Sequence, residues 1–173
     1  VALLFMQDLY EATHENVQLA VREGIELVFV ERIAGHHSVE LLTMVGARFP
    51  LVATGMGRVL LAHAPADIQE AVLEAPLQPF TAHTVTDPRT LRAQLAAIKR
   101  EHYVISDRQL SETTVAVAAP VRLGTTGPVL AALGIVVAAE SATRVRGLRD
   151  PLIRAAQQIS AELGARARSG HLT

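Results

Sequence analysis

The sequence predicts an α+β domain built on one antiparallel sheet of about six strands, with helices packed against it. Segments rich in β-branched residues follow one another in pairs joined by short turns, as in hairpins. Segments with helical periodicity lie at the two ends and in a central insertion, which argues against a doubly wound fold. No Pro-, Gly- or Ser-rich linker divides the 173 residues, so residues 1–173 are expected to form a single domain.

The first part of the chain predicts a helix and then a hairpin. Apolar residues at helical spacing carry the helix to about Thr13; they are Leu3, Met6, Leu9 and Tyr10. Residues 17–21 and 25–30 are β-branched segments joined by a turn at Gly24, and they predict an antiparallel pair. A third extended piece is expected at residues 39–44.

Residues 48–62 form the junction around which the other elements are arranged. An apolar run ends at Thr54, a good helix N-cap, and Gly55 and Gly57 follow. One face of the helix is expected to lie on the core, with Met56, Val59, Leu60 and His63. The glycines have two interpretations. They leave the N–H groups at the positive end of the helix open to a small carboxylate, or they let the turn pack tightly under a neighbouring strand.

The second half of the chain continues with two helices, three strands and a closing helix. A short helix is expected over residues 65–73, two prolines leave residues 76–79 irregular, and Asp87 with Pro88 starts a helix that reaches Arg100. Strands are expected at residues 103–105, 115–121 and 129–138, with a turn at residues 124–127 before the last of them. A closing helix is expected over residues 143–167. We expect helices on one face of the sheet and a concave site for a small molecule on the other.

Composition excludes several classes of function. The chain has no cysteine, which removes disulfide frameworks, thiolate zinc sites and cysteine nucleophiles. Its formal charge is −1 without a block of like charges, so this chain alone is not expected to bind DNA. No apolar run reaches the ~18 residues of a membrane span, and the start at Val1 lacks the pattern of a signal peptide. We therefore expect a soluble, cytoplasmic protein, and a fragment whose upstream part is missing.

Five stretches of the chain, in order, are similar to the motifs of one known family. The central stretch includes Ala-Thr-Gly-Met-Gly-Arg at residues 53–58. The five stretches are residues 17–33, 48–62, 84–95, 103–121 and 131–133. Over nearly its whole length the chain thus resembles the C-terminal effector-binding domain of the IclR family of bacterial transcriptional regulators. The resemblance implies a GAF-like domain that senses a small metabolite and follows a winged helix-turn-helix DNA-binding domain, which is absent from this chain.

The resemblance also implies a site over the start of the central helix. The matching positions are Leu41, Phe49, Thr54, Gly55, Met56, Ser106, Thr114, Ala116, Gly134 and Val136. Members that bind very small keto-acids carry an acid, a cysteine and two serines at four of these positions, so this pocket is expected to be roomier and less polar. Residues 56–62 are similar to the subgroup that regulates aromatic-acid catabolism, whereas residues 112–116 depart from it. The expected ligand is a small organic carboxylate with an apolar or aromatic body.

The family resemblance further implies a homodimer or tetramer, since two-fold operators are bound by two-fold symmetric proteins. Apolar residues such as Leu4 and Phe5 on the first helix are expected to be exposed for this contact. DNA would be bound only through the absent domain, and no membrane partner is expected.

Other classes of function stay open beside this one. An enzyme is not expected, because the chain has no Gly-x-Ser-x-Gly elbow, phosphate loop or His-Glu-x-x-His motif. A dimerisation module with an empty cavity would share the fold and lack only the ligand. No cofactor, metal ligand or catalytic residue is assigned. His36 and His37 are expected in a solvated loop, and the sequence leaves open whether His83, His102 and Asp107 meet around a metal.

Overall fold

Six strands form one antiparallel sheet in the computed structural model of the chain, which describes residues 1–35 and 43–170. Every neighbouring pair of strands is antiparallel. Across the sheet the order is β3 (Arg48–Pro50), β2 (Glu26–Ile33), β1 (Asn16–Glu23), β6 (Val129–Ala138), β5 (Thr114–Arg122) and β4 (Val104–Asp107). The predicted α+β class and the number of strands are confirmed.

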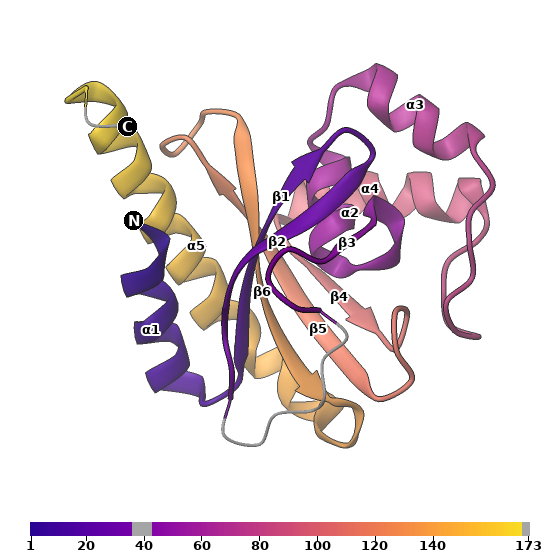
Figure 1. Cartoon of the computed structure of the whole chain (residues 1–173), viewed down its shortest axis with the longest axis horizontal. Coiled ribbons are helices and arrows are strands. Elements are labelled where there is room, and N and C mark those ends of the chain that lie inside the picture. Colours follow the sequence, from indigo (N-terminus) through magenta and orange to yellow (C-terminus); the bar gives the residue numbers. More distant parts are fainter. Residues whose placement is uncertain (36–42, 171–173) are drawn as a thin grey trace.

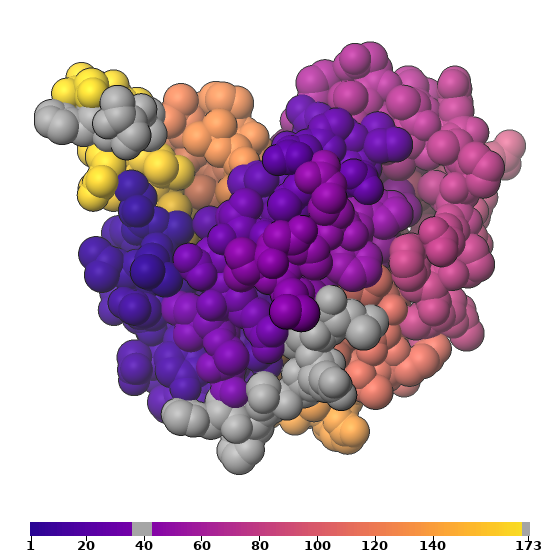
Figure 2. Space-filling view, viewed as in Figure 1, coloured from indigo at the N-terminus to yellow at the C-terminus, as the bar shows by residue number. Residues whose placement is uncertain are grey.

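Helices cover both faces of this sheet (Figure 1). On one face lie α1 (Ala2–Thr13) and α5 (Val145–Arg168), which pack side by side. On the other lie α2 (Gly55–Ala62), α3 (Ala66–Glu74) and α4 (Pro88–Glu101). Short 3-10 turns precede α2 and α5, namely η1 (Leu51–Ala53) and η2 (Ala139–Arg144). In the space-filling view a notch at the top of the molecule separates the turn between β5 and β6, which stands beside the end of α5, from α3 (Figure 2).

The expectation that helices would cover one face only is therefore wrong. The physical reason is visible in β6, where residues 131–137 are all buried without alternation. A strand that leaves one face in water alternates between apolar and polar residues, whereas a strand covered on both faces stays apolar. The site for a small molecule must then lie between the sheet and a helix layer.

Two cores follow from the alternation of side chains along the central strands. Val117 and Leu133 face the core formed with α1 and α5, whereas Ala118 and Ala132 face the core formed with α2. The residues on the α2 face are small, and Ala20 of β1 continues the row. Small side chains let a helix axis approach a sheet closely, so this row determines how near α2 lies.

The short helix α2 is buried along its whole length, although the sequence predicted a single apolar face. It contacts η1, α3, α4 and five strands of the sheet. The Thr54 hydroxyl accepts a hydrogen bond from the N–H of Gly57 at 2.8 Å, so the predicted N-cap is confirmed. A Cβ atom at Gly57 would lie 2.1 Å from the Leu51 carbonyl oxygen. Gly57 is therefore required because the first turn of α2 packs directly on the preceding turn.

The other predicted elements are present with small differences in their ends. The hairpin of β1 and β2 turns at Gly24, which has a positive φ of 61°. Asp87 caps α4 by accepting a hydrogen bond from the N–H of Thr90 at 2.9 Å. Most of the extended piece expected at residues 39–44 lies outside the described residues, and its last two residues form no strand. No helix of the described ranges is both long and apolar enough to cross a bilayer.

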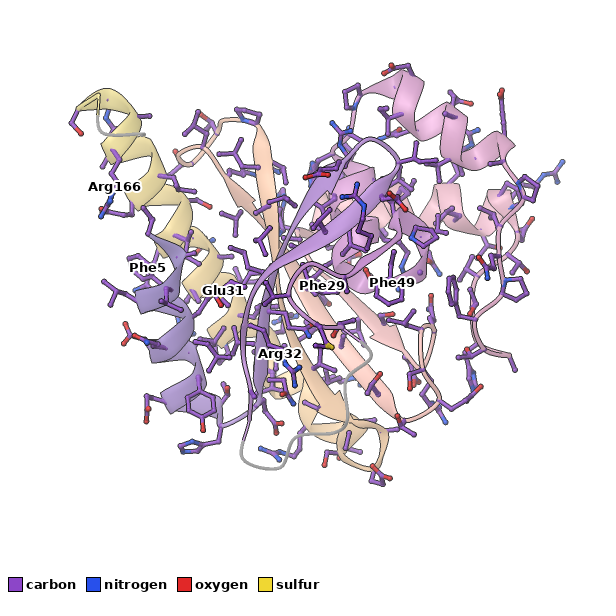
Figure 3. The ribbon with its side chains drawn as sticks, in the orientation of Figure 1. Phe5, Phe29, Glu31, Arg32, Phe49 and Arg166 are labelled. Carbon is purple, nitrogen blue, oxygen red and sulfur yellow. The ribbon has the colours of Figure 1, made fainter. Side chains whose placement is uncertain are left out.

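The exposed surface of α1 differs from the expectation at one position. Leu4 is 69% exposed, as expected, and Leu3 is exposed beside it. Phe5 instead packs partly buried against the core that α1 shares with α5 (Figure 3). The apolar surface of this helix therefore consists of aliphatic side chains.

Substitution of Gly57 by alanine is expected to destabilise the domain strongly. The new methyl group would overlap the Leu51 carbonyl, and overpacking of a buried site costs about 1 to 3 kcal/mol or more. The matched control is Gly147→Ala in α5, where a Cβ meets nothing within 4 Å, and where alanine is expected to stabilise by about 0.5 to 1 kcal/mol. Urea unfolding measures both, and equal stabilities would contradict this account of α2.

Candidate functional site

A cavity lies between the start of α2 and the sheet. It leaves about 50 Å³ for a ligand, which is room for roughly two water molecules. Its wall is formed by the start of α2, by strands β1, β2, β4, β5 and β6, and by the loop before β5. The lining residues are Gln18, Phe29, Thr43, Thr54, Gly55, Met56, Ser106, Gln109, Leu110, Ser111, Thr114, Ala116 and Val136.

The start of α2 directs polar groups into this cavity. Gly55 and Met56 occupy the first two helical positions, where backbone N–H groups have no acceptor within the helix and carry the positive end of its dipole. The Thr54 oxygen accepts from Gly57, so its own proton is left for another acceptor. This end of the cavity therefore suits an anionic oxygen.

A buried cation lies directly behind this end of the cavity. Arg58 is 1% exposed; its Nε donates to the Thr54 carbonyl at 3.4 Å and its Nη1 donates to Gln94 Oε1 at 2.8 Å. Its Nη2 is buried and has no hydrogen-bond partner within residues 1–35 and 43–170. Burial lowers the pKa of the guanidinium to about 10, so it stays charged at neutral pH. An unpaired charge in a low dielectric acts strongly on its surroundings, and it favours an anion nearby.

The far wall of the cavity carries neutral polar groups. Across the sheet, Ser106, Ala116 and Val136 lie side by side on β4, β5 and β6. The hydroxyl groups of Ser106 and Thr114 have no partner among the residues the structure describes, and Gln109 Oε1 is buried without one. Gln18, 1% exposed, donates through Nε2 to the Thr43 hydroxyl. No ionised side chain of the described ranges lines the cavity, so a ligand would meet dipoles rather than a salt bridge.

Seven of the ten positions predicted from the resemblance line this cavity, two do not, and one lies outside the described residues. Phe49 does not line the cavity, and its ring packs edge-to-face on the lining residue Phe29 with 6.2 Å between the ring centroids (Figure 3). Gly134 is covered by the side chain of Met56. Leu41 lies outside the described residues. Met56 and Phe29 line the cavity and also belong to the core over this face of the sheet.

Sequence reasoning missed six lining residues, namely Gln18, Phe29, Thr43, Gln109, Leu110 and Ser111. One of them carried a usable signal. Gln18 is polar within an apolar strand, and it shares a face with Ala20, which belongs to the core. The loop before β5 and Thr43 are brought to the site by tertiary contacts that no local pattern indicates.

The structure also decides between the two interpretations of the glycines. A Cβ at Gly55 would lie 3.2 Å from Ser106 Cβ and 3.7 Å from Ala118 Cβ, which places that side of the residue against the sheet. With Gly57 packed on Leu51, both glycines serve close packing. Gly55 and Met56 line the cavity because of where the start of the helix lies.

The histidines do not assemble a metal site in the part of the chain that is described. No group of three His, Cys, Asp or Glu side chains there lies close enough to hold an ion. His83 lies 3.4 Å from Glu112 through Nε2, while His102 ends α4 near His63. His36 and His37 lie outside the described residues.

Comparison with known proteins assigns this fold and sequence to a family. A model of the family described as bacterial transcriptional regulator IclR C-terminal matches residues 1–161. The chain belongs to the IclR family. The resemblance seen in the five sequence stretches is thus confirmed, and the chain corresponds to the C-terminal domain of an IclR-type regulator.

Individual IclR relatives agree with this assignment. The HTH-type transcriptional regulator KipR of Bacillus subtilis is 34% identical over 122 residues, which are 70% of this chain and 49% of that protein. The regulator BhcR of Paracoccus denitrificans is 30% identical over 170 residues, 95% of this chain and 60% of that protein. This chain therefore spans about half to three fifths of these relatives.

A solved IclR structure superposes closely on this domain. It is an IclR homolog from Microbacterium hydrocarbonoxydans complexed with 4-hydroxybenzoate, with a TM-score of 0.88 and 36% sequence identity. The superposition covers 95% of this chain and 67% of that chain.

His63, at the end of α2, predicts how the stability of the domain depends on pH. Burial, and then the positive charges of Arg122, Lys99 and His102, lower the pKa of His63 to about 4. Its folded pKa lies below the unfolded value of 6.5, so the unfolded chain takes up the proton first as pH falls. The folded state should therefore lose stability between pH 6.5 and 4. The shift corresponds to about 3 kcal/mol, and the half-buried position reduces the expected loss to about 1 to 2 kcal/mol.

The measurement is urea unfolding at pH 7 and at pH 4.5. In His63→Gln, which cannot take up a proton, this part of the pH dependence should disappear. His83→Gln, which removes a more exposed histidine, is the control and should keep the wild-type profile. An unchanged profile in His63→Gln would show that other groups cause the acid sensitivity.

Proposed function

We propose that this domain is the effector sensor of an IclR-type regulator, and that its cavity binds a small organic carboxylate with an apolar or aromatic body. The observation that carries the proposal is the start of α2, where two helical N–H groups, the Thr54 hydroxyl and the charge of Arg58 act on the same end of one cavity. An anion at such an end gains about 0.3 to 1 kcal/mol from the helix dipole before direct hydrogen bonds are counted.

The apolar body of the ligand is inferred from the remaining wall. Phe29, Leu110 and Val136 offer burial to a ring, which contributes about 25 cal/mol per Å² of apolar surface. Ser106, Thr114 and Gln109 supply a few polar groups that have no partner among the described residues, enough for one hydroxyl or carbonyl on that ring. The complex of the Microbacterium homolog with 4-hydroxybenzoate supports an acid of this kind.

The regulatory role follows from the family. We propose that the complete protein is cytoplasmic and binds DNA through an N-terminal domain, and that the ligand changes this binding. The curated IclR relatives are transcriptional regulators, which favours sensing over catalysis. A dimerisation module with an empty cavity is the alternative, because the space is small.

Isothermal titration calorimetry should show binding of benzoate, 4-hydroxybenzoate or protocatechuate that is tighter than that of pyruvate or glyoxylate. Benzamide should bind at least about tenfold more weakly than benzoate, because it lacks the charge that α2 and Arg58 attract. Ser106→Ala removes a hydroxyl of the cavity wall and should weaken binding of the preferred acid about tenfold or more. Ser141→Ala, away from the cavity, is the control and should bind as the wild type does.

Two results would contradict this proposal. Tighter binding of the two- and three-carbon acids would exclude the apolar body. An absence of heat and of thermal stabilisation with every acid would favour the dimerisation module, since a saturating ligand must raise the melting temperature.

We also propose that the domain self-associates through α1. Leu3 and Leu4 are exposed apolar residues on this helix. Leu4→Asp should weaken association at least about tenfold, because it places a charge on the contact. Sedimentation velocity measures this against Gln78→Asp, an exposed position after α3 on the opposite side of the sheet. A wild type that stays at 18.5 kDa at high concentration would exclude self-association of the isolated domain.

A further inference from the structure

Met56 of α2 packs against Gly134 of the sheet. Met56 is 4% exposed, stands at the second position of α2 and lines the cavity. A Cβ atom built on Gly134 would lie 2.8 Å from its Sδ, 3.0 Å from its Cγ and 3.3 Å from its Cε. All three of the nearest atoms belong to Met56, so the missing side chain of Gly134 makes a niche that this thioether fills.

The niche adjoins the floor of the cavity. On the sheet Gly134 lies between Gln18 of β1 and Ala118 of β5. Gln18 lines the cavity, and so does Val136, two residues along β6 on the same face. Ala118 is fully buried, and a Cβ at Gly55 would already touch it. A Met56 side chain raised out of the niche would therefore move toward the open space of the cavity.

We propose that Met56, seated on Gly134, sets the depth of the cavity and thereby selects the size of the acid that binds. This inference rests on the proposed function. The cavity keeps its space of about 50 Å³ only while Met56 stays in this niche, so the seat on Gly134 limits the size of the acid that can enter. Methionine suits this role because it has three rotatable bonds, and its sulfur makes favourable contacts with aromatic rings.

Reciprocal substitutions test the pair by calorimetry with benzoate, the bicyclic 2-naphthoate and pyruvate. Gly134→Ala lifts Met56 into the cavity and should weaken benzoate about tenfold while changing pyruvate less. The variant should fold, because the overlap falls on the far end of a flexible side chain. Met56→Ala deepens the cavity and should improve the affinity for 2-naphthoate about tenfold relative to that for benzoate.

The double variant Met56→Ala, Gly134→Ala isolates the coupling between the two residues. Without Met56 the new methyl group has nothing to displace, so Gly134→Ala should leave benzoate affinity nearly unchanged in this background. Unfolding measurements provide a readout without ligand: Gly134→Ala should lower the melting temperature only when Met56 is present. Gly147→Ala, in open space on α5, controls for the general effect of replacing a glycine.

The outcomes separate the two proposals. If the wild type binds benzoate and Gly134→Ala has the same effect on affinity with and without Met56, this inference is overturned and the proposed function stands. If no acid binds the wild type, both the proposed function and the size selection by Met56 are wrong. In that case the coupling of the two residues in unfolding would still report their packing.

Discussion

The close approach of α2 to the sheet and to its own preceding turn is the constraint on which the rest of this domain depends. Gly57 allows the first turn of the helix to rest on the Leu51 carbonyl, and the Thr54 hydroxyl closes that turn. Ala118 and Ala132 have small side chains, so the strands that carry them allow α2, which is buried along its whole length, to pack close to the sheet. This packing brings the N–H groups at the start of α2 over the wall formed by β4, β5 and β6, and so creates the cavity.

The electrostatics of the cavity follow from the same arrangement. A buried charge without a partner is costly, yet Arg58 keeps its guanidinium between the Thr54 carbonyl and Gln94, with one nitrogen unsatisfied. In the proposed complex, a carboxylate at the start of α2 would offset part of this cost, because charges interact strongly where the dielectric is low. The cavity therefore needs no charged residue in its wall to favour an anion, and its hydroxyl and amide groups are left to select the rest of the ligand.

The caps and turns of this domain could be predicted from the sequence because they depend on local chemistry. The cap at Thr54, the cap at Asp87 and the turn at Gly24 are short-range hydrogen-bonding or backbone requirements, and each was predicted. The covering of both faces was missed although β6 carried the signal, an apolar run without alternation. Gly134 was assigned to the ligand, whereas it contacts Met56, because a glycine in a strand does not show which side chain fills its space.

The sequence by itself determined the class of fold, the order of its elements and the family, since periodicity, capping residues and motif order are properties of the chain. Only the tertiary structure decided which residues share the cavity. Gln18 and Thr43 are 25 residues apart, and their hydrogen bond depends on how β1 and the segment before β3 pack. The size of the cavity was decided there too, because packing alone determines the space that the start of α2, the strands and the loop before β5 leave between them.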